Sequence, residues 1–172
     1  MNITGGIYNG RKIKSPDEKI VRPTLSKVRM SVFNVLYSEL GDFAGMSFLD
    51  MFGGSGVMGL EALSRGFERV VVFEKNRAVS QIIKDNYKAL GLNPNLTVGD
   101  GIKFASKLDE EFDVVYIDPP YMSGIYEQAL DVIPKSKVVV LEHVVEVNFE
   151  GYELIKQKKY GDKYLSFLKK IS

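Results

Sequence analysis

Apolar and polar residues alternate along most of this chain in blocks that indicate strands followed by helices. Short apolar runs predict strands at about 46–51, 70–74, 96–99, 113–117 and 137–142. Apolar residues at helical spacing predict helices near 56–65, 77–90 (with Asn76 as cap and Gly91 as stop), 101–107 and 124–132. Regular alternation of this kind is typical of an α/β fold with a mostly parallel sheet and helices on both faces.

The two ends of the chain follow other patterns. Runs at 152–160 and 164–169 flank the turn Gly161-Asp162-Lys163, which predicts a hairpin whose last strand is antiparallel to the others. At the other end we expect a short hairpin around the turn Tyr8-Asn9-Gly10-Arg11, then a helix over Leu25 to Leu40 with Thr24 as its N-cap. The whole is predicted to be one domain, with 1–40 as a basic extension and 41–172 as the core.

The most informative motif ends the strand at 113–117. The apolar run continues directly into Asp118-Pro119-Pro120-Tyr121. Two prolines make a stiff loop without two backbone donors, so the Asp118 carboxylate and the Pro119 carbonyl can both accept hydrogen bonds from one planar amine. The ring of Tyr121 offers a face on which the attached base can stack. The alternative is a strand ended by an ordinary Pro-Pro turn.

A glycine-rich turn follows the first predicted strand of the core. Asp50 ends this strand, and Gly53-Gly54-Ser55-Gly56 leads into the helix near 56–65. A strand, a glycine turn and a helix N-terminus together are typical of nucleotide-type cofactor sites. A carboxylate at Asp50 is a poor neighbour for a pyrophosphate but a good one for the ammonium group of an amino acid.

Two further acids stand at strand ends. Glu74 lies about twenty residues beyond the glycine turn, where a carboxylate accepts from ribose hydroxyls, and Asp100 lies where it could accept from the adenine amine. An amino-acid end, a ribose and an adenine describe S-adenosylmethionine better than NAD. A single acid at a strand end is more often a turn or cap residue, so the prediction rests on all three together.

Composition restricts the class of protein. The chain has 172 residues, no cysteine and a single histidine, which exclude a disulfide framework, a thiolate metal site and a multi-histidine metal site. His143 is expected to pack at a strand end rather than to act chemically. The start has no apolar signal region and no stretch approaches membrane-spanning length, so we expect a cytoplasmic protein without a membrane partner.

Charge is distributed unevenly behind a net value of +1. Residues 1–31 carry seven basic and two acidic residues, and residues 156–172 carry six basic residues and one acid. Basic ends around an acidic core predict a polyanionic substrate held by the ends. Lys27 and Arg29 are expected near the first turn of the helix that starts at Leu25, where the helix dipole disfavours cations, so a phosphate there would offset both. A structural pairing of either arginine of this segment, Arg22 or Arg29, with a core acid is the alternative.

These motifs together resemble the RsmD family of bacterial methyltransferases, which methylate the exocyclic N2 of one guanine in 16S ribosomal RNA. The likeness covers nearly the whole chain. Gly53 stands where alanine is usual, which we expect to loosen the loop slightly, and the ends look shorter than in longer members. The matching residues include Thr4-Gly5-Gly6, Gly10-Arg11, Arg22-Pro23-Thr24, Val28-Arg29, Phe33-Asn34, 50–56, Gly59 to Gly66, Asp118 to Tyr121, Glu142-His143 and Tyr160-Gly161-Asp162.

The resemblance implies a Rossmann-like class I fold with a seven-stranded sheet, S-adenosylmethionine as methyl donor and S-adenosylhomocysteine as product. It implies 16S rRNA, in an assembling 30S particle, as the partner of a monomeric enzyme that uses no metal. The predicted catalytic residues are Asp118, Pro119 and Tyr121. The predicted cofactor contacts are Asp50, Phe52, Gly53, Gly54, Gly56, Glu74, Lys75, Asp100, Gly101 and Asp118. The predicted RNA contacts are Arg11, Lys12, Arg22, Thr24, Lys27 and Arg29.

Three other functions share parts of this pattern. A DNA adenine-N6 methyltransferase would use the same pocket, but the roughly forty residues before the core look too short for a target-recognition region. A protein-glutamine methyltransferase uses a related loop with asparagine in place of Asp118. A non-catalytic RNA-binding or assembly module could keep the fold, although the intact Asp118 and glycine turn argue against it.

Overall fold

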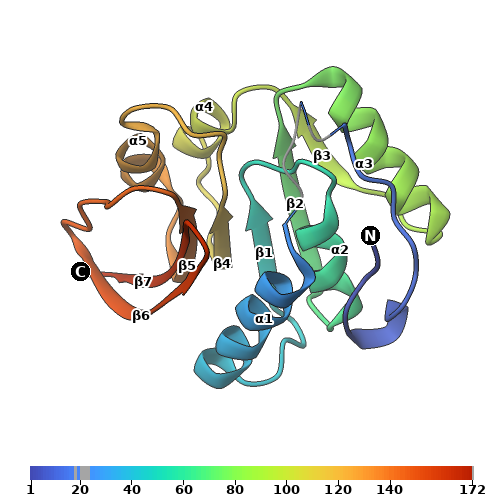
Figure 1. Cartoon of the computed structure of the whole chain (residues 1–172), viewed down its shortest axis with the longest axis horizontal. Coiled ribbons are helices and arrows are strands. Elements are labelled where there is room, and N and C mark those ends of the chain that lie inside the picture. Colours follow the sequence, from blue (N-terminus) through green and yellow to red (C-terminus); the bar gives the residue numbers. More distant parts are fainter. Residues whose placement is uncertain (18, 20–23, 172) are drawn as a thin grey trace.

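The computed structural model describes residues 1–17, 19 and 24–171. One sheet and its flanking helices make up most of the molecule (Figure 1). In chain order the elements are η1 (Gly6–Tyr8), α1 (Ser26–Leu40), β1 (Ser47–Asp50), α2 (Val57–Ser64), β2 (Arg69–Glu74), α3 (Arg77–Ala89), β3 (Asn95–Val98), α4 (Gly101–Ser106), β4 (Phe112–Ile117), α5 (Ile125–Val132), β5 (Ser136–His143), β6 (Tyr152–Tyr160) and β7 (Lys163–Lys170).

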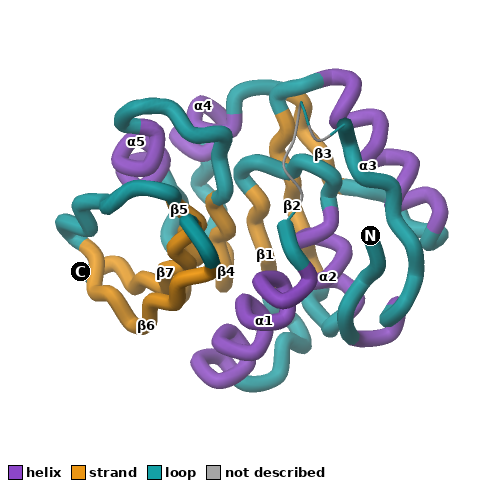
Figure 2. Tube along the Cα trace, in the orientation of Figure 1, coloured by secondary structure: helices purple, strands orange, loops and turns teal. Residues whose placement is uncertain are grey.

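The sheet has seven strands in the order β3-β2-β1-β4-β5-β7-β6. Strands β1 to β5 are parallel to one another, whereas β7 inserts antiparallel between β5 and β6 (Figures 1 and 2). The α/β class, the parallel core strands and the antiparallel C-terminal hairpin predicted from the sequence are therefore confirmed.

Two apolar cores lie on the two faces of the sheet. Side chains alternate along a strand, and in β4 Val114 and Tyr116 enter one core while Val115 and Ile117 enter the other. The first core includes residues of α1, α2 and α3, and the second includes residues of α4 and α5. Burial on both faces explains why these strands read as continuous apolar runs.

The predicted helix ends differ in how well they match. Asn76 caps α3 as expected, because its Oδ1 accepts from the backbone N–H of Val79 at 3.1 Å, and Gly91 follows the end of α3 with φ +71°. The prediction that Thr24 caps α1 is wrong. Leu25 is the N-cap residue, and it makes no side-chain cap hydrogen bond.

The predicted N-terminal hairpin is reduced to a single antiparallel bridge between Asn2 and Lys12. Backbone bonds still join the two arms, because the N–H of Ile3 donates to the Arg11 carbonyl at 3.0 Å and the N–H of Ile13 donates to the Met1 carbonyl at 2.9 Å. The pairing does not extend into a longer ladder, since the next donors bond to side chains of α2. The N–H of Thr4 donates to both carboxylate oxygens of Glu61 at 3.0 Å, and the N–H of Tyr8 donates to the Ser64 hydroxyl at 2.9 Å.

Glu61 joins the N-terminal segment to the core. Its carboxylate is fully buried and accepts from Thr4, from Arg29 Nε at 3.0 Å and from Arg65 Nε at 3.4 Å. Arg29 also donates to the carbonyls of Asn2 and Thr24. One carboxylate therefore ties residues 2–4, α1 and α2 together.

Within the described part of the chain, none of the helices has the length and apolar character needed to cross a bilayer.

We expect Glu61→Gln to lower the free energy of unfolding by about 3 kcal/mol, because it leaves two buried or half-buried guanidinium groups without their carboxylate. Urea denaturation checks this. Glu68→Ala, on the surface just beyond α2, is the control and should change the free energy by less than about 0.5 kcal/mol. Equal effects of the two substitutions would contradict the role given to Glu61.

Candidate active site

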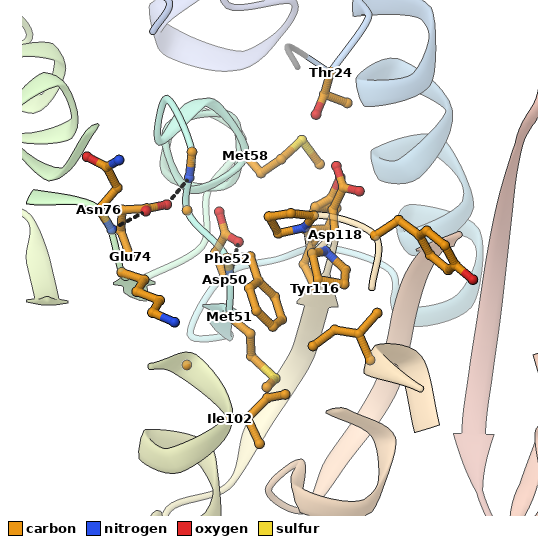
Figure 3. Close-up of a pocket in the computed structure, with 18 of the residues that line it drawn as sticks. Thr24, Asp50, Met51, Phe52, Met58, Glu74, Asn76, Ile102, Tyr116 and Asp118 are labelled. Atoms are coloured by element: carbon orange, nitrogen blue, oxygen red, sulfur yellow. Dashed lines mark hydrogen bonds between the residues drawn. The ribbon is translucent and has the colours of Figure 1, made fainter. Parts of the chain in front are cut away.

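A cavity of about 910 Å³ opens at the carboxyl edge of the parallel strands. Its walls come from the segments that follow β1, β2, β3 and β4, with Lys163 of β7 closing one side. In Figure 3, Asp50 lies between Glu74 and Asp118, in the order in which β2, β1 and β4 stand in the sheet. The acids predicted at separate strand ends therefore meet in one cavity.

Asp50 is the most deeply buried of these acids. It is 1% exposed, and its Oδ1 accepts from the N–H of Phe52 at 3.2 Å. Burial raises the pKa of Asp50 to about 8, and the nearby carboxylates of Asp118, Glu74 and Glu142 add to this shift. A cation placed beside Asp50 would reverse the effect, so the site favours a positively charged ligand group.

Glu74 is held rigidly at the end of β2. Its Oε1 accepts from the N–H of Gly54 at 2.9 Å, and its Oε2 accepts from the N–H of Asn76 at 2.7 Å. A carboxylate oxygen can accept more than one hydrogen bond, so the group keeps capacity for a pair of ligand hydroxyls. Lys75, next in the chain, is exposed and also lines the cavity.

The glycine turn brings backbone close to the neighbouring elements. A Cβ on Gly53 would lie 2.5 Å from Cγ1 of Val72, and one on Gly101 would lie 2.3 Å from the carbonyl oxygen of Met51. Gly54 and Gly56 have φ of 58° and 80°, a backbone conformation that residues with a side chain rarely adopt. The expectation that Gly53 loosens the loop is wrong, because this position is closely packed.

Asp100 caps α4 from the end of β3. Its Oδ1 accepts from the N–H groups of Ile102 and Lys103, at 2.9 and 3.4 Å. Asp100 also lines the cavity together with Gly101 and Ile102. The cap hydrogen bonds hold Asp100 at this wall of the cavity. The predicted contact between Asp100 and an adenine amine stays a prediction.

The Asp118–Tyr121 loop forms the opposite wall of the cavity. Tyr121 is 53% exposed at the rim, and its ring centre lies 6.0 Å from that of Tyr126. A ring so exposed is open to stacking by an incoming planar group. Asp118 is half-buried at the end of β4, and its Oδ1 lies 2.9 Å from Nζ of Lys163.

Sequence reasoning did not identify Lys163 or Glu142 as parts of the site. Lys163 bridges the Asp118 carboxylate and the buried Glu142 carboxylate, whose Oε1 lies 3.1 Å from Nζ. The contact exists because β7 inserts beside β5. The available signal was Glu142 itself, because an acid at the end of the apolar run 138–141 needs a partner when it is buried.

The six predicted RNA contacts separate into four groups, the last of which is the buried Arg29. Arg11, Lys12 and Lys27 are exposed, and Lys27 Nζ lies 5.8 Å from the centre of the Tyr160 ring. Thr24 lines the cavity. Arg22 lies outside the described residues.

The prediction that Arg29 binds RNA is wrong. The side chain is 3% exposed and is paired with Glu61 inside the protein, so it cannot reach a phosphate. Its charge at the start of α1 is offset by the Glu61 carboxylate rather than by a ligand anion.

His143 packs at the end of β5, as predicted. It is 2% exposed, and its ring nitrogens lie 2.7 Å from the carbonyl oxygen of Val145 and 2.7 Å from the Ser166 hydroxyl. The ring stacks on Tyr164 at 5.1 Å, and burial holds the pKa of His143 below its usual range. These contacts account for the side chain without a chemical role.

The chain is similar to known proteins over nearly its whole length. A family profile described as "Conserved hypothetical protein 95" matches residues 1–169. The chain belongs to this family. It is the RsmD family that the sequence motifs resemble, so that prediction is confirmed.

Relatives of the RsmD family resemble the chain over most of its length. It is 32% identical to "Ribosomal RNA small subunit methyltransferase D" of Escherichia coli (strain K12), over 87% of this chain and 75% of that protein. It is 32% identical to "Putative rRNA methyltransferase YlbH" of Bacillus subtilis (strain 168), over 86% and 84%. The solved structure "Putative methyltransferase yhhF from Escherichia coli" superposes with a TM-score of 0.86 at 28% identity, over 99% and 97%. The methyltransferase fold predicted from the sequence is therefore confirmed.

Asp50→Asn should stabilise the protein more at pH 8.5 than at pH 5. Because the folded-state pKa of Asp50 is raised to about 8, the unfolded chain releases this proton first, and wild-type stability falls as the pH rises from about 4 to about 8. Asparagine does not ionise, so the gain should approach zero near pH 4 and reach on the order of a few kcal/mol above pH 8. Thermal denaturation across this range checks the difference, and a gain that does not vary with pH would contradict the raised pKa.

Proposed function

We propose that this protein transfers a methyl group from S-adenosylmethionine to the exocyclic N2 of a guanine in 16S ribosomal RNA. The observation that carries the proposal is the meeting of Asp50, Glu74 and Asp118 in one cavity beside the exposed ring of Tyr121. Relatives named as ribosomal RNA small subunit methyltransferases support the choice of RNA as substrate.

The cavity fits the proposed cofactor group by group. The amino-acid ammonium would lie at Asp50, whose buried carboxylate favours a cation. Glu74 would accept from the ribose hydroxyls, with Lys75 beside it. The close backbone of Gly53, Gly54 and Gly56 would let the ligand approach, and Phe52, Asp100 and Gly101 would enclose the adenine. When bound, S-adenosylmethionine supplies a methyl group activated by its sulfonium charge.

The Asp118–Tyr121 loop would orient the acceptor amine. An amine conjugated to a ring is a weak nucleophile because its lone pair is delocalised into the ring. Hydrogen bonds from its N–H groups to the Asp118 carboxylate and the Pro119 carbonyl would turn the lone pair out of the ring plane, while Tyr121 stacks on the base. The contribution of the loop is thus orientation and electrostatic stabilisation of the positive charge that develops on nitrogen.

RNA would approach from the side that carries the N-terminal segment. Arg11, Lys12 and Lys27 offer exposed cations, and Thr24 lies at the cavity wall. A paired guanine has its N2 edge occupied, so the base must be unpaired or flipped into the cavity. We propose that the protein acts as a monomer on an assembling 30S particle, which would locate its action in the cytoplasm.

One transfer experiment separates this function from its rivals. Labelled S-adenosylmethionine is supplied with naked 16S RNA, immature 30S particles, duplex DNA or protein, and the product is digested and analysed for N2-methylguanosine. We expect transfer to an RNA-containing acceptor only. Label in N6-methyladenine would instead show a DNA adenine methyltransferase, and label in glutamine would show a protein methyltransferase. No transfer to any acceptor would favour a non-catalytic binding module.

In the same assay, Asp118→Ala should lower turnover on the order of a hundredfold or more, because the amine loses an orienting acceptor. Asp109→Ala, an exposed acid outside the cavity, should have no effect. Tyr121→Ala should cost about 1–3 kcal/mol of stacking, whereas Tyr121→Phe should keep most activity. A Tyr121→Phe variant as inactive as Asp118→Ala would assign the role to the hydroxyl instead.

Glu74→Ala should weaken S-adenosylmethionine binding by about 1.5–3 kcal/mol, since two charge-assisted hydrogen bonds to the ribose are lost. Titration calorimetry measures the change. Circular dichroism checks that the variant remains folded, because Glu74 also bonds to Gly54 and Asn76. Unchanged affinity in a folded variant would remove Glu74 from the cofactor site.

Lys27 and Arg29 provide a matched pair for the RNA surface, because they lie on the same helix but only Lys27 is exposed. Lys27→Ala should flatten the plot of log affinity against log salt by up to about 0.9 for one lost phosphate contact. Arg29→Ala should lower thermal stability instead. Filter binding over a salt series measures the slope, and an unchanged slope for Lys27→Ala would place the RNA elsewhere.

A further inference from the structure

A buried carboxylate beside the active site has no role in the function proposed above. Glu142, at the end of β5, is 1% exposed. Within the described residues its Oε2 has no hydrogen-bond partner, and its close charged contact is Nζ of Lys163. Burial raises the pKa of Glu142, and the Lys163 ammonium opposes that rise. Burying a carboxylate with so few partners lowers the stability of the fold. Such a residue is more readily explained if Glu142 holds another group in place.

Glu142 holds Lys163 against Asp118. β4 and β5 are parallel with Ile117 opposite Leu141, so Asp118 and Glu142 extend side by side from neighbouring strand ends. Lys163 enters from β7, and its Nζ lies 2.9 Å from Asp118 Oδ1 and 3.1 Å from Glu142 Oε1. These two contacts fix a single ammonium between two carboxylates at the cavity wall. The lysine side chain is 28% exposed there.

Among the described residues, the titratable groups near Asp118 include several acids. Asp50 faces it from β1, Glu142 from β5, Tyr126 from α5 and Lys163 from β7, with Glu74 further along the row of acids. Burial acts to lower the pKa of Lys163, but the carboxylates of Asp118 and Glu142 together hold it above its usual range. Lys163 is therefore a cation at neutral pH.

We propose that Lys163 is a positioning residue for methyl transfer, which uses its ammonium, anchored by Glu142, to hold the Asp118 carboxylate ionised and correctly oriented toward the acceptor amine. This inference rests on the proposed function, in which Asp118 accepts a hydrogen bond from that amine. Without Lys163, Asp118 would lose both the nearby ammonium that favours its ionised form and the contact that fixes its orientation. A protonated carboxyl would be a weaker acceptor for the amine. It would also give less stabilisation to the positive charge that develops on the amine nitrogen.

A titration without substrate tests whether Lys163 keeps the Asp118 carboxylate ionised. Carbon-13 NMR of the carboxyl groups follows Asp118, assigned by the signal that disappears in Asp118→Asn. Lys163→Met should raise the titration midpoint of Asp118 by about one pH unit or more. Lys163→Arg should keep the wild-type midpoint because the charge remains. The control is Lys169→Met, on the same strand but paired with Glu39 on the surface, and it should also leave the midpoint unchanged.

Kinetic measurements test whether Lys163 contributes to methyl transfer. Lys163→Met should lower kcat at pH 7 by about tenfold to a hundredfold, as expected when an orienting contact is lost. The acid limb of the plot of kcat against pH should move to higher pH in this variant. The Kd for S-adenosylmethionine, measured by calorimetry, should change little. Lys163→Arg should recover most of the turnover.

A double variant separates positioning from simple charge compensation. Lys163→Met leaves Glu142 as a buried carboxylate without its cation, so thermal stability should fall. Lys163→Met/Glu142→Gln should regain that stability but keep the low kcat. Recovery of both stability and kcat in the double variant would show that Lys163 only offsets Glu142, and would overturn the proposal.

The two sets of measurements also distinguish this inference from the function on which it rests. An unchanged Asp118 midpoint in Lys163→Met, or unchanged kcat, overturns the positioning role even if the wild type methylates RNA. If the wild type transferred no methyl group to RNA while the Asp118 midpoint moved as expected, the proposed function would fail, and only the electrostatic coupling of Lys163 to Asp118 would stand.

Discussion

The candidate site depends on the parallel pairing of β1 with β4. The sheet is built outward from this pair, with β2 and β3 on one side and β5 on the other, so the loops after β1 and β4 diverge and leave a crevice at the carboxyl edge. Asp50 and Asp118 stand at the two ends that border this crevice. Glu74, Asp100 and Lys163 extend this edge from neighbouring strands, and Thr24 adds to the cavity wall from the segment before α1.

Concentrating carboxylates at one edge has an energetic consequence. Asp50 is buried beside Asp118, Glu74 and Glu142, and the resulting rise of its pKa means that the Asp50 carboxylate opposes folding at neutral and higher pH. Such an arrangement is unfavourable for stability and favourable for a ligand that brings positive charge. Lys163 supplies part of that charge from within the protein, at the one carboxylate that the proposed chemistry requires to be ionised and fixed.

A second buried carboxylate, Glu61, serves the opposite purpose. It is fully satisfied by Thr4, Arg29 and Arg65, and these contacts connect the N-terminal segment to α1 and α2. This explains why Lys27 and Arg29, two residues apart in a basic segment, differ so completely. Lys27 is exposed on the surface of α1, whereas Arg29 is part of the packing that holds α1 on the sheet.

The sequence by itself determined the strands, most helix ends, the antiparallel hairpin and the acids at the ends of β1, β2, β3 and β4. These features follow from local periodicity, turn residues and the rule that parallel strands share a carboxyl edge. It could not show that Arg29 is buried, that Gly53 is closely packed, or that Lys163 reaches Asp118 and Glu142. Each of these depends on residues far apart in the chain, and such contacts are decided by how α1, α3 and β7 pack on the sheet. A charge reads the same in the sequence whether it faces solvent or another charge, and only the tertiary structure decides between them.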